Sequence, residues 1–360
     1  MASEKLIASA IAALLFLCDM VSVAQTASIE ALYSEIDKLP PQQRQKRLED
    51  GARKEGAFVH YSVSNAELIN AYVKAFMNKY PFIKADYWRG SGNQLVFRTL
   101  MEHRAGKLGA DVISVGTENV IALKKAGIFA RYRSPEIQYY PREQYDKDGY
   151  FHADSLGIAT IAYNHQLVKK EEAPKTYNDL LDPKWKGSLT IDLEPERALT
   201  AWLLAWGEAK TREFVQKLLT NGTSVRRGHT LQAQLLCAGE FKIAVEIYPD
   251  AILRMKKNGC PATIVFANPT PAVVGGNYAI YVNTLHPNAA ALFIDFALSA
   301  EGSKILAGTG RVHRRKGVKS FYEELSDLDE KGVPLLIITP EQTEEVTKPM
   351  EKIMKELLVP

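Results

Sequence analysis

Short apolar runs alternate with amphipathic stretches along most of the chain. The first apolar run covers residues 57–63, and the stretch from Asn65 to Pro81 repeats apolar residues at the 3.6-residue spacing of a helix. Two more strands are predicted at 83–88 and 111–115, each followed by a helical stretch. Together these segments form three successive strand–helix units, which is the pattern of an α/β sheet with right-handed crossovers.

The second half of the chain continues the alternation. The helix at 289–298 is the clearest, because Leu292, Phe293 and Phe296 lie on one stripe. A last helix is predicted to begin at Thr339-Pro340-Glu341, where Thr is a capping residue and Pro fits the first turn, and Pro349 is expected to kink or split it. Further strands are predicted at 156–164, 188–191, 241–247, 262–266 and 272–283, and further helices at 198–219 and 230–238.

The first 24 residues have the pattern of a secretory signal peptide. Lys5 precedes a largely apolar run from Leu6 to Cys18, and Ser22-Val23-Ala24 places small residues where a signal peptidase cuts. A retained membrane anchor is the alternative, but the apolar run is too short to span a bilayer. The sequence therefore predicts secretion into the periplasm, with residues 25–47 as a helical extension of the mature chain.

Composition narrows the classes of function. A length of 360 residues predicts two lobes or domains, and 46% hydrophobic with 24% charged residues is typical of globular proteins. The 45 basic residues nearly balance the 42 acidic ones, so we expect no nucleic-acid partner. After signal cleavage the chain keeps Cys237 and Cys260. An oxidising compartment permits these two to bridge, and the sequence leaves that pairing open.

Four blocks of residues, in order, carry a family resemblance. They are 52–61 (ARKEGAFVHY), 101–115 (MEHRAGKLGADVISV), 182–187 (DPKWKG) and 286–306 (HPNAAALFIDFALSAEGSKIL). With this order and spacing, the chain resembles the extracellular solute-binding proteins of ABC importers, in particular the ferric-iron-binding branch. The last block is the most specific of the four.

The resemblance implies an α/β, two-lobe class II periplasmic-binding-protein fold with hinge crossings and a ligand cleft between the lobes. It also implies a monomer that captures a small solute and delivers it to a membrane permease, with no cofactor. The implied crossings lie near 157–164 and 270–277. The expected divisions are a signal peptide at 1–24, an extension at 25–47, lobe one at 48–155 plus 272–318, and lobe two at 156–271 plus 319–360.

Ligands of open α/β sheets bind at the carboxyl ends of the strands, against helix N-termini. In lobe one this rule selects the loops after the first three strands. The Gly90-Ser91-Gly92 turn is the strongest anion candidate, because glycines let free backbone N–H groups converge on an oxyanion. Each polar residue in these loops is equally well explained as a helix N-cap. The lobe-one candidates are Ser62, Ser64, Asn65, Ser91, Gly92, Thr117 and Glu118.

In lobe two the candidates are Tyr163, Arg197 and Tyr248. Arg197 has the geometry to hold a carboxylate or phosphate with two hydrogen bonds, and the alternative is a surface ion pair with Glu194 or Glu196. Tyr248 falls where the iron-binding branch has two adjacent tyrosines, but here Pro249 replaces the second. The sequence therefore favours a small oxyanion, carboxylate or phosphorylated metabolite over ferric iron.

An enzyme on the same two-lobe fold is the rival class. The sequence contains no GxSxG, HExxH, GxxxxGK[ST] or GxGxxG motif. A secreted enzyme would have to use cleft carboxylates such as Glu194, Glu196 and Glu246, which nothing in the sequence pairs. We therefore expect a binding protein that turns nothing over.

Overall fold

The computed structural model describes residues 29–107 and 109–358, and these residues divide into two compact units. Unit 1 contains the described residues up to Ala153 together with Gly276–Gly302, and unit 2 contains Asp154–Gly275 and the described residues from Ser303 onward. The predicted signal peptide, 1–24, lies outside the described residues. Among the helices of the described part, none is long and apolar enough to cross a membrane.

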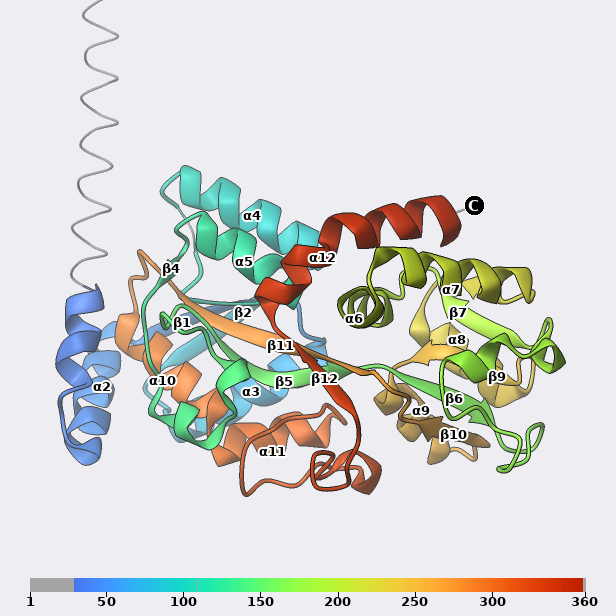
Figure 1. Ribbon diagram of the computed structural model, residues 1–360. Coiled ribbons are helices and arrows are strands. Elements are labelled where there is room, and N and C mark those ends of the chain that lie inside the picture. The colour runs from blue at the N-terminus through green and yellow to red at the C-terminus, as the bar shows by residue number, and fades with distance from the viewer. Residues whose placement is uncertain (1–28, 108, 359–360) are drawn as a thin grey trace, which may run out of the picture. The chain divides into compact units, whose positions relative to one another are not determined.

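The mixed α/β architecture predicted from the sequence is confirmed in both units (Figure 1). In unit 1 the strands run in the order β11 (Thr270–Tyr281), β3, β1, β2, with β1 parallel to both β2 and β3 and β11 antiparallel to β3. The elements of unit 1 are α2 (Pro41–Glu55), β1 (Ala57–Ser62), α3 (Ala66–Lys79), β2 (Lys84–Arg89), α4 (Gly92–Arg104), β3 (Val112–Val115), α5 (Thr117–Lys125), β4 (Phe129–Ala130) and α10 (Pro287–Leu298).

The period-two alternation of β1 sends side chains to two different helix layers. Phe58 packs on Phe293, with ring centroids 4.5 Å apart, and so faces α10. Tyr61 instead belongs to the apolar cluster on the side of α4 and α5, together with Leu95 and Val120. Helices therefore cover both faces of the unit 1 sheet, and the carboxyl ends of β1, β2 and β3 lead directly into α3, α4 and α5.

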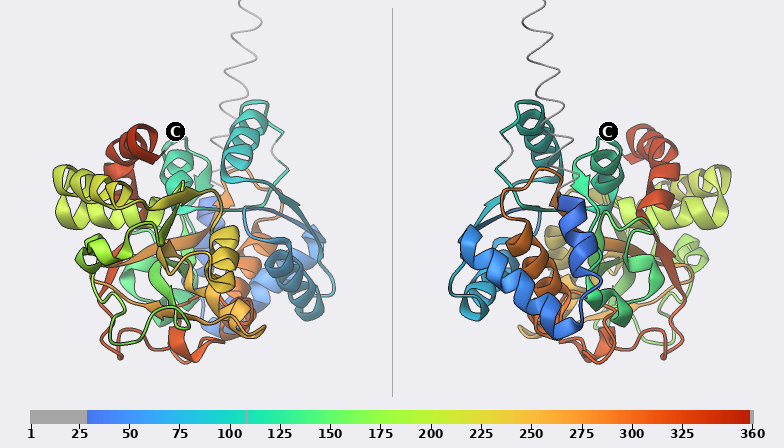
Figure 2. Two further views of the ribbon diagram at one scale, coloured as in Figure 1. Left: turned by 90° about the vertical axis from the view of Figure 1, so that its right-hand side faces the viewer. Right: turned by 90° about the vertical axis from the view of Figure 1, so that its left-hand side faces the viewer.

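The N-terminal extension is an integral part of unit 1, although its polar sequence suggests a peripheral segment. Helix α2 lies along α10, as the right-hand view of Figure 2 shows. The Glu55 carboxylate accepts hydrogen bonds from the backbone N–H groups of Asn288 (3.0 Å) and Ala289 (2.8 Å), so it caps the N-terminus of α10. Arg44 on α2 forms an ion pair with Asp295 on α10 at 2.7 Å.

Unit 2 is built on a five-stranded sheet in the order β10, β6, β9, β7, β8. Strand β7 is parallel to β8 and β9, whereas β6 runs antiparallel to β9. The elements of unit 2 are β6 (Thr160–Asn164), β7 (Leu189–Asp192), α6 (Glu196–Trp206), α7 (Glu208–Thr220), β8 (Ser224–Arg226), α8 (His229–Ala238), β9 (Ile243–Ile247), α9 (Pro249–Lys256), β10 (Ala262–Val265), β12 (Leu335–Ile338) and α12 (Pro340–Ile353).

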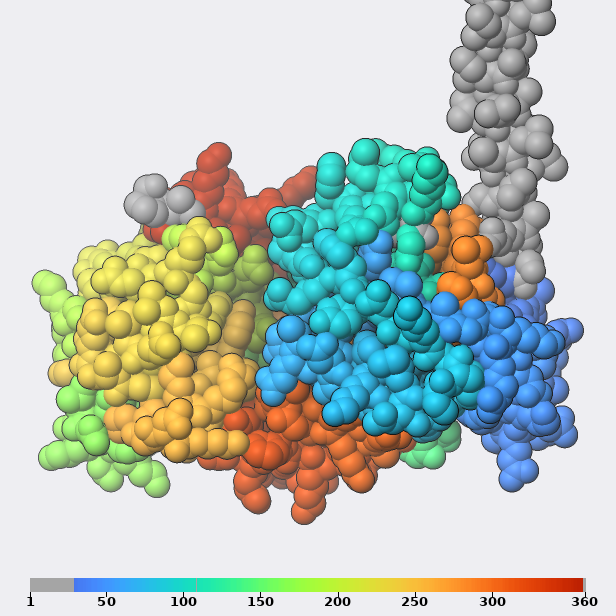
Figure 3. Space-filling model, turned by 180° about the vertical axis from the view of Figure 1, so that it is seen from behind, coloured from blue at the N-terminus to red at the C-terminus, as the bar shows by residue number. Residues whose placement is uncertain are grey.

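Two helix layers cover this sheet. The larger core cluster joins Trp202 of α6 and Phe214 of α7 to Val245 of β9, and Ile353 of α12 packs into it. The other face carries α8 and α9, which form the yellow and gold surface in Figure 3. Cys237 on α8 and Cys260 after α9 form a disulfide, so the pairing that the sequence leaves open is made in this structure.

The structure corrects three details of the sequence interpretation. The single strand expected at 156–164 is two strands, β5 (His152–Ile158) and β6. The single helix expected at 198–219 is broken at Gly207, whose φ of 79° is incompatible with a continuing right-handed helix. Pro349 does not split α12, which continues past it to Ile353.

The chain passes between the units at 153/154, 275/276 and 302/303. Strands β5 and β11 (Thr270–Tyr281) and helix α11 (Ala300–Gly308) contain these positions. The expected divisions of the sequence analysis put 303–318 in lobe one, whereas the structure groups these residues with unit 2. One reason is visible in the backbone: Leu156 N–H donates to the Val312 carbonyl at 2.8 Å.

Candidate functional site

Three helix N-termini meet the carboxyl edge of the unit 2 sheet. Strands β7, β8 and β9 are parallel, so they end at the same edge. Asp192 is the last residue of β7, and Tyr248 caps α9 directly after β9. Arg197 lies in the first turn of α6, and His229 is the first residue of α8. The parallel topology thus gathers residues that are up to 56 positions apart in sequence.

Arg197, Tyr248 and His229 form a three-layer stack. The Arg197 guanidinium carbon lies 3.7 Å from the centroid of the Tyr248 ring. The His229 ring lies 3.8 Å from that centroid and is inclined to it by 14°. Two groups at this distance must occupy opposite faces of the phenol ring. The Arg197–Tyr248–His229 stack therefore fixes the phenol ring in place and gives it a cation on at least one face.

The guanidinium of Arg197 is positioned by backbone as well as by the ring. Its Nη1 donates to the Ile158 carbonyl at 3.2 Å. A methyl group on Gly157 would lie 2.7 Å from the guanidinium carbon, so a glycine is needed for this close approach. The alternative pairing with Glu194 is wrong, because Glu194 binds Arg227 at 2.9 Å. Within the described part of the chain, Arg197 forms no ion pair with any carboxylate.

His229, by contrast, lies between two buried carboxylates. Its Nε2 donates to Glu246 at 2.7 Å, and its Nδ1 is 3.6 Å from Asp192. Asp192 also accepts the backbone N–H groups of Gly228 (2.7 Å) and Glu194 (2.9 Å). Burial alone would lower the pKa of His229, but the Glu246 and Asp192 carboxylates outweigh burial and raise that pKa. Burial also raises the pKa of the Tyr248 phenol well above its ordinary value.

This arrangement predicts how His229 contributes to stability. Because its pKa is raised in the folded protein, the stabilisation is full below pH of about 6.5 and is lost as pH rises through the folded-state pKa. The free-energy difference between the wild type and His229→Gln should therefore be larger at pH 5.5 than at pH 9. Urea unfolding of both proteins across this range measures it. An unchanged difference would mean that Asp192 and Glu246 do not hold an imidazolium.

Tyr163, the third candidate in the second half, lies in a different environment. It is 5% exposed on β6 and belongs to the apolar core with Trp202 and Ile243. The structure therefore places its ring in the core of unit 2. The sequence reasoning missed His229, because no feature of the sequence separates it from a surface histidine.

In unit 1, several of the candidate residues form hydrogen bonds that stabilise their own loops and helix starts. Ser62 is fully buried, bonds the Ser114 hydroxyl at 2.7 Å and accepts the Ser64 N–H at 3.1 Å. Asn65 caps α3 by accepting the Leu68 N–H at 2.9 Å. Ser91 forms a capping box with Gln94 at the start of α4. For Asn65 and Ser91 the structure thus shows the N-cap geometry that was the alternative to ligand binding.

The other unit 1 candidates surround the starts of α4 and α5. Thr117 is the buried first residue of α5, and Glu118 is exposed and accepts from the Asn119 amide at 2.8 Å. Gly92 is the first residue of α4 and does not have a positive φ. The constraint there is steric, because a Cβ on Gly92 would lie 2.7 Å from the Asn119 amide nitrogen.

One cation at these loops was not anticipated. Arg89 ends β2 immediately before the Gly90-Ser91-Gly92 turn, and its Nε donates to the Ser64 carbonyl at 2.9 Å. Arg89 is exposed. Its position one residue before the glycine turn was a usable signal in the sequence. Residues 29–107 and 109–358 contain no group of three or more His, Cys, Asp and Glu side chains placed to hold a metal ion.

The fold and this strand-end site define a class of protein. A model of the family described as bacterial extracellular solute-binding protein matches residues 110–321 of the chain. The chain belongs to this family, and its fold is that of the two-lobe class II periplasmic binding proteins.

Individual relatives agree with this assignment. An uncharacterized protein of Haemophilus influenzae is 28% identical over 269 residues, which is 71% of this chain and 76% of that protein. The crystal structure of iron-bound HitA from Pseudomonas aeruginosa matches with a TM-score of 0.70 and 20% identity, over 82% of this chain and 99% of that one. AfuA from Actinobacillus pleuropneumoniae, solved with fructose-6-phosphate, matches with a TM-score of 0.67 and 22% identity, over 85% of this chain and 99% of that one.

Proposed function

We propose that this protein captures a small anionic solute in the periplasm and delivers it to the membrane permease of an ABC importer. Family membership supports solute binding as the general role. The observation that carries the anionic part is the guanidinium of Arg197, which is positioned on three sides and has no acidic partner among the described residues.

The lack of a direct carboxylate partner for Arg197 among the described residues favours an anion there. His229 is matched by two carboxylates, Glu246 and Asp192, whereas Arg197 has none. A half-buried guanidinium without a counterion is costly, and a bound carboxylate or phosphate supplies that counterion. The planar fork of Arg197 binds such groups through two parallel hydrogen bonds. The Tyr248 hydroxyl supplies a further donor beside it.

In this proposal the loops at the strand ends of unit 1 provide the remaining contacts. Arg89 adds positive charge there, and the Ser64, Ser91 and Gly92 region adds hydroxyl and backbone donors. The two units close around the solute as a hinge, as the two-lobe fold permits. Binding without turnover by a monomer is part of the same proposal, since the family consists of binding proteins.

Ferric iron fits the unit 2 site less well than an anion does. A tyrosine binds iron as a phenolate, and burial raises the pKa of the Tyr248 phenol. Arg197 lies 3.7 Å from the ring and would repel a trivalent cation. Pro249 stands where a second phenol would be required for a two-tyrosine site. Relatives of this fold include both an iron-bound protein and one with a sugar phosphate, so a direct comparison is informative.

A thermal-shift screen tests the proposal. We expect fructose 6-phosphate, other phosphate esters, phosphonates or small carboxylates to raise the melting temperature, and matched neutral sugars to leave it unchanged. Ferric citrate should produce no visible charge-transfer band beyond that of the reagent. A red protein after iron loading that loses its colour in Tyr248→Phe would overturn the choice of an anion over iron.

A further inference from the structure

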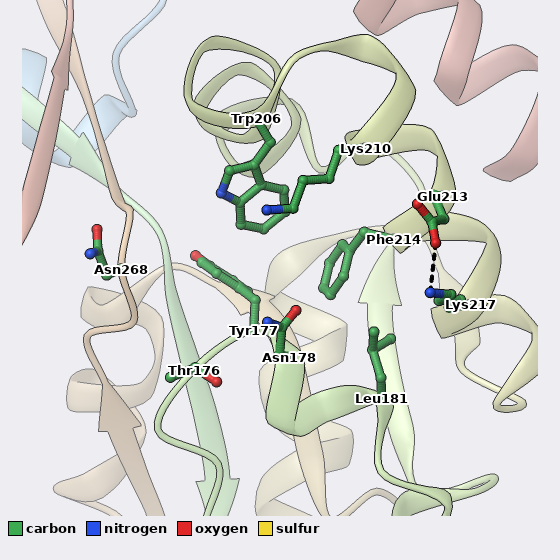
Figure 4. Close-up of a pocket in the computed structure, with 10 residues that line it drawn as sticks. All are labelled: Thr176, Tyr177, Asn178, Leu181, Trp206, Lys210, Glu213, Phe214, Lys217 and Asn268. Atoms are coloured by element: carbon green, nitrogen blue, oxygen red, sulfur yellow. Dashed lines mark ion pairs between the residues drawn. The ribbon is translucent and has the colours of Figure 1, made fainter.

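Unit 2 contains a pocket at the opposite end of α6 from Arg197. Arg197 is in the first turn of this helix and Trp206 is its last residue, so about 14 Å of helix separates them. The pocket has a volume of about 340 Å³, within the range of small-molecule sites. Figure 4 shows its lining, which comes from α6, α7, the segment at 176–181 and Asn268.

Three aromatic side chains form the walls of this pocket. The Trp206 ring centroid lies 5.6 Å from that of Tyr177 and 5.4 Å from that of Phe214, and both rings are nearly perpendicular to it. Trp202 stacks behind Trp206, with the two planes only 3° apart. Trp206 is therefore held by the core while remaining partly exposed. Rigid walls of this kind suit a planar ring, which can stack on one face or meet an edge.

The charged side chains that line the pocket are two lysines and one glutamate, so one lysine has no glutamate to pair with. Glu213 and Lys217 form an ion pair at 2.7 Å and neutralise each other. Lys210 instead reaches across Trp206, its ammonium 5.6 Å from the ring centroid, and forms no ion pair within the described residues (Figure 4). Lys210, Glu213 and Lys217 together carry a net charge of +1, and this positive charge beside an aromatic wall favours a ligand that joins a ring to a negative charge.

We propose that this pocket binds a small planar aromatic carboxylate, with its ring against Trp206, Tyr177 and Phe214 and its carboxylate toward Lys210. The site is separate from the solute site at Arg197 and does not depend on the proposed transport function. Thr176, Asn178 and Asn268 place polar groups at its mouth. The pocket adjoins the C-terminal end of α6, the helix whose first turn carries Arg197. A ligand in the pocket therefore contacts α6 at the end away from Arg197.

Benzoate and its neutral analogue benzamide test this site in the full mature protein. Ligand-observed NMR should detect both, because both can stack on the aromatic walls. Lys210→Gln should weaken benzoate binding by about two- to fivefold and leave benzamide unchanged. Trp206→Leu should weaken both by about two- to tenfold. Lys186→Gln, an exposed lysine of unit 2 outside the pocket, is the matched control for charge.

The outcomes separate the two sites of unit 2. Unchanged benzoate binding in Arg197→Gln supports the pocket, whereas its loss in that variant would place benzoate at the solute site and overturn the proposal. Failure to detect either probe, or equal loss of benzoate and benzamide in Lys210→Gln, would also overturn it. Far-UV circular dichroism checks that Trp206→Leu folds. If that variant does not fold, the comparison of benzoate with benzamide in Lys210→Gln still tests the proposal.

Discussion

Exchanging Arg197 for glutamine should weaken binding of the anionic solute by about ten- to a hundredfold. Hydrogen bonds to a charged group contribute about 1.5–3 kcal/mol, and each 1.4 kcal/mol corresponds to a factor of ten in affinity. Glutamine keeps an amide donor, but it is shorter than arginine and loses the positive charge and the two-pronged fork. Calorimetric titration with the solute identified by the thermal-shift screen measures the change.

Two further variants make this result specific. Gly157→Ala leaves Arg197 in the sequence but puts a methyl group 2.7 Å from its guanidinium carbon, so it should weaken binding in the same direction by displacing the side chain. Arg227→Gln removes an exposed arginine of the same unit that is paired with Glu194, and it should leave affinity unchanged. Full affinity in folded Arg197→Gln would show that the anion binds elsewhere.

Exchanging Asp295 for alanine should destabilise unit 1 by about 3–5 kcal/mol, which is the cost of breaking a buried ion pair from one side. Asp295 accepts hydrogen bonds from Arg44 (2.7 Å), Tyr132 (2.6 Å) and Ser134 (2.7 Å). The side chains of Arg44 and Asp295 are only 9% and 13% exposed. Their ion pair fixes the N-terminal helix α2 to α10, so its loss leaves a buried cation at that contact.

The same helix offers a matched control. Lys46 and Asp50 on α2 also form an ion pair at 2.7 Å, but their side chains are 76% and 52% exposed. Asp50→Ala should therefore leave the free energy of unfolding nearly unchanged. Urea unfolding of the three proteins gives the comparison. Similar losses in Asp50→Ala and Asp295→Ala would mean that α2 is held by something other than the buried pair.

Periodicity was sufficient for the layout of secondary structure. The strands at 57–63 and 111–115 and the helix after Asn65 are all confirmed, because local spacing of apolar residues reports which face of an element is buried. At Gly207, the local sequence pattern did not predict the break between α6 and α7. A glycine inside an apolar helical stretch is tolerated or breaks the helix according to its φ, and tertiary packing sets that angle.

The rule that ligands meet strand ends selected a set of candidate loops but could not sort the side chains within them. Ser62 follows the pattern of a ligand residue, yet its hydroxyl is used by Ser114 in the interior. His229 has no sequence feature that separates it from a surface histidine. It becomes part of the site only because β7 and β9 are adjacent and bring Asp192 and Glu246 to it.

The α/β architecture, the family resemblance and the choice of Arg197 and Tyr248 as candidates were accessible from the order of residues alone, because they depend on local periodicity, on short motifs and on residue chemistry. Whether Arg197 is paired with an acid was not accessible, because an ion pair depends on which side chains the folded backbone brings within a few ångströms. In this structure Glu194 forms an ion pair with Arg227. Arg197 instead packs against Gly157 and Tyr248 and has no carboxylate partner among the described residues. Long-range contacts between β5, α6 and α9 therefore decide the electrostatics of the site.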